Sequence, residues 1–145
     1  MIMSRANPDQ GGTQSTSRIE NNTFYGNTGS SSFIDIAGDN EYVNVTNNII
    51  WANNKGQDES SNIYKTNSAT VYVNNNIFEA DVSGGTLVDN INDPPKLRNP
   101  ASADYRLQGS SPAIDAGADV GAVFDYRGFY LSLIHISEPT RPERR

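Results

Sequence analysis

Acidic side chains gather in one short stretch of this chain. Asp35, Asp39 and Glu41 lie within seven residues of one another, and Asp58 and Glu59 follow in a polar segment. Calcium takes several oxygen ligands, and carboxylates are well suited to supply them. We therefore expect Asp35, Asp39 and Glu41 to be candidate calcium ligands. The alternative is a solvated acidic face that holds no ion.

An aromatic residue and a basic residue stand side by side further along the chain, at Tyr64 and Lys65. Strand alternation around Ile34 and Ile36 predicts that Asp35 points outward, and a strand stacked on this one would bring Tyr64 next to it. An exposed ring beside a carboxylate suits stacking on a sugar and binding of its hydroxyl groups. Lys65 is the nearest candidate base. We predict that these three residues bind substrate, and no residue is assigned a catalytic role.

The composition excludes several other kinds of chemistry. The chain has no Cys, so thiolate metal sites, disulfides and Cys nucleophiles are absent, and its one His leaves little room for His-based catalysis or zinc. The net charge is −6 and there is no basic stripe, so we expect no nucleic-acid partner. The mean hydropathy is −0.60, and no apolar run is long enough to span a membrane. Nothing in the sequence indicates an oligomer.

A repeat runs through the part of the chain that must position these residues. Three nine-residue segments, 19–27, 45–53 and 73–81, align without gaps. Each has an aliphatic residue, an Asn pair, a large apolar residue and a final Asn or Asp. Successive Asn pairs lie 26 and then 28 residues apart, and the pairs are Asn21/Asn22, Asn47/Asn48 and Asn75/Asn76.

The local pattern of each repeat is that of short strands joined by Asn turns. Val43–Val45 and Val71–Val73 alternate with the strand period, and no helical stripe is present. Asn tolerates left-handed backbone, and equivalent Asn side chains could hydrogen-bond from one repeat to the next. Buried turn amides left unpaired would cost about 1–3 kcal/mol each. We therefore predict an all-β solenoid; the near-constant spacing favours it over a Greek-key sandwich.

The repeats resemble those of right-handed parallel β-helix proteins, the pectate-lyase-like superfamily, over residues 17–92. The resemblance implies about three coils, three parallel sheets, and an Asn ladder between the second and third sheets. It also implies a polysaccharide substrate, with calcium and an Arg or Lys base in those members that are lyases. The predicted strands are 33–36 and 63–64 in the first sheet, 43–45 and 71–73 in the second, and 49–51 and 77–78 in the third; the loops are 53–62 and 81–86.

The region after the repeats differs in composition, because it contains several Pro residues. Pro94, Pro95 and Pro100 bar ladder pairing, so we expect a surface loop with a short extended piece at Asp104–Leu107. The stretch Asp89–Asp93 has the first acidic positions of a calcium loop without its Gly and distal Glu, and we expect it to carry the chain off the last coil.

The C-terminal half of this region carries a second resemblance. Asp104-Tyr-Arg-Leu and Ser111-Pro-Ala-Ile-Asp-Ala-Gly117 resemble the end of bacterial choice-of-anchor Q surface proteins. That resemblance implies an extracellular or cell-surface location. Residues 131–141 resemble a translated sequencing adaptor, in which case His135 is not native; the alternative is a genuine strand or helix with a basic tail.

The sequence therefore predicts four regions. These are a loop or incomplete coil at 1–16, β-helix coils at 17–92, an extended terminal segment at 93–130, and a non-native tail at 131–145. We expect a fragment of a secreted or surface β-helix protein that binds or degrades polysaccharide, in the first instance an acidic one. The alternative is a non-catalytic adhesin or structural stalk. Whether the whole protein is an enzyme is left open, because fold alone does not determine activity.

Overall fold

The computed structural model describes residues 2–4, 16–28, 34–39, 41–53, 62–65, 68–79 and 82–121. Asp58, Glu59 and the tail with His135 lie outside these ranges, so the predictions made for them stay predictions. The described residues form β-strands and one short 3-10 helix, η1 (Pro100–Ser102), with no α-helix among them. The expected all-β class is confirmed.

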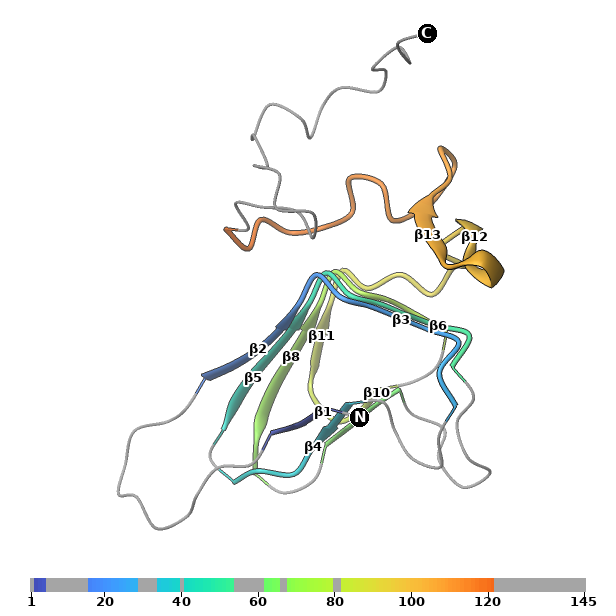
Figure 1. The fold of residues 1–145 in the computed structure, drawn as a ribbon. Helices are drawn as coiled ribbons and strands as arrows, with labels where there is room; N and C mark the ends of the chain where they lie inside the picture. The colour runs from blue at the N-terminus through green and yellow to red at the C-terminus, as the bar shows by residue number, and fades with distance from the viewer. Residues whose placement is uncertain are drawn as a thin grey trace, which may run out of the picture.

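Within the described ranges, eleven strands stack into three parallel sheets that surround the core like the sides of a triangle (Figure 1). The first sheet contains β1 (Ile2–Ser4), β4 (Ile34–Ile36), β7 (Ile63–Lys65) and β10 (Val82–Ser83). The second contains β2 (Thr16–Glu20), β5 (Tyr42–Thr46), β8 (Thr70–Asn74) and β11 (Thr86–Val88). The third contains β3 (Thr23–Tyr25), β6 (Ile49–Trp51) and β9 (Ile77–Phe78). This arrangement is a parallel β-helix, and it excludes the Greek-key sandwich.

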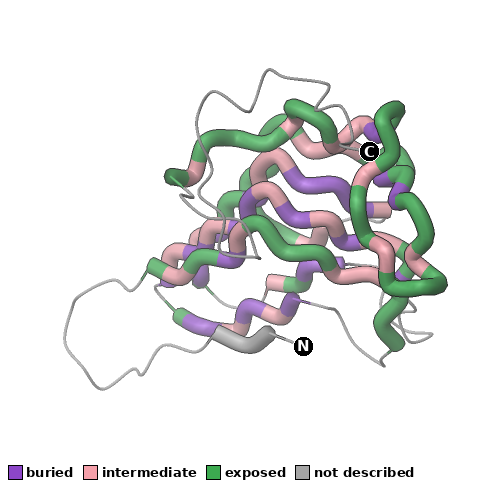
Figure 2. The backbone as a smooth tube through the Cα atoms, turned by 45° about the horizontal axis from the view of Figure 1, so that its top comes forward, coloured by how far each residue is buried: buried purple, intermediate pink, exposed green. Residues whose placement is uncertain are grey.

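Apolar side chains of successive coils stack in columns inside the triangle. Ile34 aligns with Ile63 and Val45 aligns with Val73, and all four are fully buried. Buried positions alternate with more exposed ones along the strands, as the colours of Figure 2 show. Burying such a side chain contributes about 1.5–3 kcal/mol relative to exposure, so each column binds neighbouring coils together.

The turn between the second and third sheets is built from the paired Asn residues. The first Asn of each pair has left-handed backbone, with φ of 59° at Asn21, 58° at Asn47 and 54° at Asn75. Asn adopts this conformation more readily than most residues because its side chain can hydrogen-bond locally. The turn recurs at the same corner of these three coils, between the second and the third sheet.

The second Asn of each pair forms a ladder along the solenoid, which we call the inner ladder. The backbone N–H and Nδ2 of Asn22 donate to Oδ1 of Asn48 at 3.0 and 3.1 Å, and those of Asn48 donate to Oδ1 of Asn76, both at 2.9 Å. Nδ2 of Asn48 also donates to the Ile19 carbonyl at 2.8 Å. Asn48 and Asn76 are buried, so these bonds satisfy polar groups that water does not reach.

A fourth coil follows the three that the sequence predicts. Its strands are β10 and β11, and Ile91 bridges to Ile77 in place of a full third-sheet strand. Asn90 continues the inner ladder: its Oδ1 accepts from the backbone N–H of Asn76 at 2.9 Å, and Asp89 beside it has φ 51°. The expected loop at 81–86 is therefore wrong, because strand β10 and a tight Gly turn occupy most of it.

The far end of the third sheet repeats the same turn geometry. The backbone N–H and Nδ2 of Asn27 both donate to Oδ1 of Asn53 at 3.0 Å, and Nδ2 of Asn53 donates to the Phe24 carbonyl at 2.9 Å. The residues before them, Gly26 and Ala52, have φ of 67° and 54°. A second Asn ladder therefore starts at the last position of the aligned segments.

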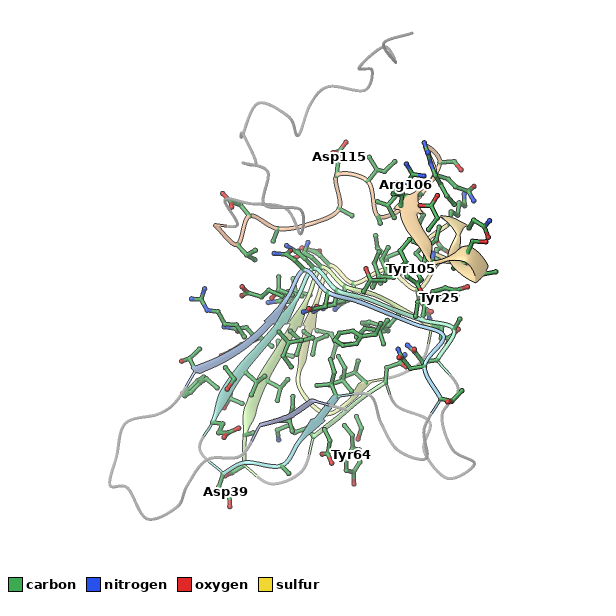
Figure 3. The ribbon with its side chains drawn as sticks, viewed as in Figure 1. Tyr25, Asp39, Tyr64, Tyr105, Arg106 and Asp115 are labelled. Carbon is green, nitrogen blue, oxygen red and sulfur yellow. The ribbon has the colours of Figure 1, made fainter. Side chains whose placement is uncertain are left out.

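Residues 92–121, the terminal segment, fold back along the outside of the coils (Figure 1). Its strands β12 (Leu97–Asn99) and β13 (Asp104–Leu107) pair antiparallel over the third sheet, and β13 matches the extended piece expected there. The ring of Tyr105 lies 6.0 Å from that of Tyr25 in the first coil (Figure 3). Leu97 is buried and aligns with Leu107, so the segment also has an apolar side chain shielded from solvent.

The end of the terminal segment is bound by the outward-pointing Asn residues. Nδ2 of Asn75 donates to the Ala116 carbonyl at 3.1 Å. Nδ2 of Asn47 donates to the Ala118 carbonyl at 2.7 Å, and the Ala118 N–H donates back to Oδ1 of Asn47 at 2.8 Å. The chain thus runs from the third coil toward the second, held at each step by a side-chain amide.

Candidate functional site

An outward-facing column on the first sheet brings two of the predicted site residues together. Asp35 aligns with Tyr64, and Tyr64 aligns with Ser83 on the next strand. Tyr64 is 37% exposed and points away from the core in Figure 3. Its flanking residue Ile63 is fully buried, as strand alternation requires. The column therefore offers a ring, a carboxylate and a hydroxyl on consecutive rungs.

The carboxylate of Asp35 is only partly satisfied. The residue is half-buried, and its Oδ1 atom is covered and has no hydrogen-bond partner. A covered acceptor without a donor costs free energy, about 1–3 kcal/mol for a typical group. A ligand or solvent hydroxyl that reached this oxygen after a small side-chain rotation would recover that energy.

Lys65 does not join this column. It aligns with the buried Ile36, so strand alternation directs it to the opposite face of the sheet from Tyr64. A Cβ placed on Gly84 would lie 3.2 Å from Cδ of Lys65, so the lysine stem packs against the Gly turn of the fourth coil. The structure therefore brings Asp35 and Tyr64 together and separates the candidate base from them.

The three predicted calcium ligands lie in different environments. Oδ1 of Asp39 accepts hydrogen bonds from the backbone N–H and Oγ of Ser68 at 3.3 and 3.1 Å, which ties the first turn of one coil to the next. Glu41 is on the same strand face as Val43 and is 2% exposed, with its side chain packed under Gly38. Asp35 is on the outer face of the first sheet.

The three side chains do not form one cluster in the structure. Among the described residues, no group of three or more His, Asp or Glu side chains could hold a metal.

The part of the chain that the structure describes contains no helix with the length and apolar character of a membrane span.

One carboxyl group in the terminal segment, that of Asp104, has a lowered pKa. Nε and one terminal nitrogen of Arg106 donate to the two carboxylate oxygens of Asp104, each at 2.7 Å. These hydrogen bonds lower the pKa of Asp104 from 3.8 to about 2. Both groups are on β13, so the pair stabilises a local extended conformation and is separate from the Asp35 column.

The second sheet carries an exposed tyrosine that resembles Tyr64 in accessibility only. Tyr72 is 38% exposed and is aligned with Asn44 and Thr86, without a carboxylate in register. It provides a matched control for any role of Tyr64.

Two elements of the molecule are missed by sequence reasoning. Ser83 falls in an expected loop, because the Gly-Gly pair after it obscures the short β10 strand. Asn90 falls outside the expected ladder, because it comes 14 residues after Asn76 whereas the earlier spacings are 26 and 28. The stretch Leu87-x-Asp-Asn90 nevertheless has the repeat's aliphatic residue and its Asx-Asn pair, and this partial match is the signal that identifies the fourth coil. Ile91 takes the position of Ile77, whereas Asn92 stands where the repeat has its large apolar residue.

Comparison with known proteins returned no match: no family model, curated protein or solved structure corresponds to this chain. The functional argument therefore depends on the geometry of the site.

Proposed function

We propose that this chain belongs to a secreted or cell-surface β-helix protein that binds polysaccharide on the outer face of its first sheet. The observation that carries the proposal is the pairing of Tyr64 with Asp35 on adjacent rungs, with the ring exposed. The proposal is for binding, since strand alternation directs Lys65, the candidate base, to the other face of the sheet.

The chemistry of the pair suits a sugar. A tyrosine ring offers an apolar surface to the C–H face of a pyranose and has a polar hydroxyl at its edge. A carboxylate accepts hydrogen bonds from sugar hydroxyls, and the unpaired Oδ1 of Asp35 has the capacity to do so. A chain of net charge −6 repels anionic polymers, so we expect neutral polysaccharides to bind more tightly than acidic ones.

The location part of the proposal is supported by the terminal segment. Its Asp-Tyr-Arg-Leu and Ser-Pro-Ala-Ile-Asp-Ala-Gly stretches resemble those of choice-of-anchor Q surface proteins. The structure gives the second stretch a physical role, because its Ala116 and the adjoining Ala118 are bound by Asn75 and Asn47.

The experiment is affinity electrophoresis of the full chain through gels containing neutral or acidic polysaccharides. We expect retardation by at least one neutral polymer, loss of retardation in Tyr64→Ala, and weakening in Asp35→Asn. Tyr72→Ala, which removes an equally exposed ring from the second sheet, should migrate like the wild type. Equal retardation of the Tyr64→Ala and Tyr72→Ala variants would refute a first-sheet site.

A second candidate function is that of a non-catalytic stalk. It is favoured by turn side chains that hydrogen-bond from one coil to the next. Hydrogen bonds at the turns join one coil to the next, and they involve Asn22, Asn48, Asn53 and Asp39. Absence of binding to every polymer tested, in a chain that unfolds cooperatively, would favour this function.

A further inference from the structure

The fourth coil leaves part of the core column open. Leu87 continues the inward column formed by Ile19, Val45 and Val73. Val45 and Val73 are fully buried, whereas Leu87 is 49% exposed and its neighbour Val88 is 47% exposed. Both lie on β11, an edge strand of the second sheet among the described residues. An inward aliphatic side chain that is half exposed marks an end face that lacks its next layer.

The inner ladder has a direction, and its two ends are complementary. Each Asn donates from its backbone N–H and Nδ2 to Oδ1 of the Asn in the following coil. At the fourth coil, the backbone N–H of Asn90 has no later Asn to which it can donate among the described residues. At the first coil, Oδ1 of Asn22 has no donor among those residues, and Asn22 is exposed. The donors at one end therefore match the acceptor at the other.

The strand registers show which residues a continuation of the stack would place together. Arg18 aligns with Asn44, Asn44 with Tyr72, and Tyr72 with Thr86, so the next residue in this column is equivalent to Arg18. By the same registers, Leu87 would meet Ile19 and Asn90 would meet Asn22. An aliphatic residue would cover an aliphatic residue, and the ladder would continue.

We propose that a second copy of this chain is the partner of the fourth coil, with its first coil stacked in parallel on β11. The contact joins two different surfaces, so each added copy presents a new open fourth coil. Association is therefore open-ended, and the mean size rises with concentration. Edge strands with free backbone groups are known to favour such pairing.

The first test measures the size of the full chain against concentration by sedimentation velocity, for the wild type and two matched variants. Leu87→Lys places a charge in the contact, and Ile114→Lys places the same charge at a 44% exposed aliphatic residue of the terminal segment. We expect growth of wild type and Ile114→Lys and a chain that stays monomeric in Leu87→Lys. A wild type that remains monomeric at every concentration, or equal growth of both variants, overturns the proposal.

The second test reads the register with cysteines, since the chain has none of its own. A Thr86→Cys chain is mixed with an Arg18→Cys chain and oxidised; the control replaces the second chain with Thr16→Cys, two residues out of register. Adjacent strands are about 4.8 Å apart, within disulfide reach, whereas a two-residue offset exceeds the roughly 7 Å limit between Cα atoms. We expect cross-linked heterodimers chiefly with Arg18→Cys. Equal yields with both partners, or a predominance of Thr86→Cys homodimers, contradicts parallel stacking.

Discussion

The two ends of the third sheet turn the chain in the same way but use the left-handed residue differently. At both ends a residue of positive φ precedes an Asn whose Oδ1 accepts two hydrogen bonds from the previous coil. At the entry turn the left-handed residue is an Asn, and Asn47 binds the terminal segment. At the exit turn it is Gly26 or Ala52, and Ala52 is exposed. At both turns, the Asn after the left-handed residue makes the hydrogen bonds to the neighbouring coil. The side chain of the left-handed residue is not needed for these bonds, so it can bind another segment, as Asn47 does.

The largest expected difference between the two turns is in their ladder residues. The side chain of Asn48 makes five hydrogen bonds with described residues and that of Asn53 makes three. Asn48→Ala should lower the free energy of unfolding by roughly 3 kcal/mol or more, and Asn53→Ala by about 1–2 kcal/mol. Urea denaturation followed by circular dichroism measures both. A larger loss for Asn53→Ala would reverse the order of importance of the two turns.

Replacing the left-handed residue of the entry turn by Gly separates the turn from the docking contact. Asn47→Gly keeps the backbone conformation and removes the bonds to Ala118, so it should lower the free energy of unfolding by about 1 kcal/mol. Hydrogen exchange of the Ala118 amide should become faster, while that of Asn48 stays protected. Unchanged exchange at Ala118 would show that the outer Asn does not hold the terminal segment.

The same substitution at the exit turn should act in the opposite direction. Ala52 has φ 54° and no described docking role, and a left-handed non-Gly residue is strained. Ala52→Gly should therefore raise the free energy of unfolding by about 0.5–1 kcal/mol, after the greater entropy of Gly in the unfolded chain is subtracted. Thermal melting in parallel with Asn47→Gly provides the comparison. Destabilisation by both variants would mean that the two left-handed positions do not differ.

The smallest expected effect concerns acid. The Asn47 side chain that binds the terminal segment has no titratable group, whereas Asp104 within that segment is a carboxylic acid. Its pKa is lowered to about 2, so its contact with Arg106 stabilises the folded state at pH above about 4 and is lost as the pH falls from there through 2. Carboxyl chemical shifts in a pH titration should show the low pKa, and Arg106→Gln should return it toward 3.8. A wild-type midpoint near 3.8 would contradict the contact.

Much of this architecture could be predicted from the sequence because its signals are local and repeated. The paired Asn residues and the strand-period apolar residues predicted a stacked all-β solenoid, and the resemblance that they carry implied its three parallel sheets and the neighbouring positions of Asp35 and Tyr64. The burial of Glu41 obeys the same alternation, since it shares a face with Val43, but charge alone suggested an exposed ligand. Proximity in sequence to Asp35 and Asp39 was misleading, because a corner of the solenoid lies between the strands.

The features that could not be predicted depend on contacts between distant parts of the chain. The docking of Ala116 and Ala118 on Asn75 and Asn47 joins residues 41 and 71 positions apart, and no local pattern encodes such a pairing. The exposed state of Leu87 likewise depends on whether another layer covers the fourth coil. Its sequence context is that of an ordinary core residue.

The short fourth coil has a consequence for how such a protein tolerates insertions. Asn76 and Asn90 are only 14 residues apart, yet the hydrogen bond from the backbone N–H of Asn76 to Oδ1 of Asn90 is 2.9 Å, the same as that from Asn48 to Asn76 across 28 residues. The circumference needed to keep the ladder closed is therefore about half of the length that the longer coils use. Coil length can therefore vary about twofold while the ladder stays joined, so we expect changes in the length of a coil to disturb the solenoid less than substitutions of its ladder residues.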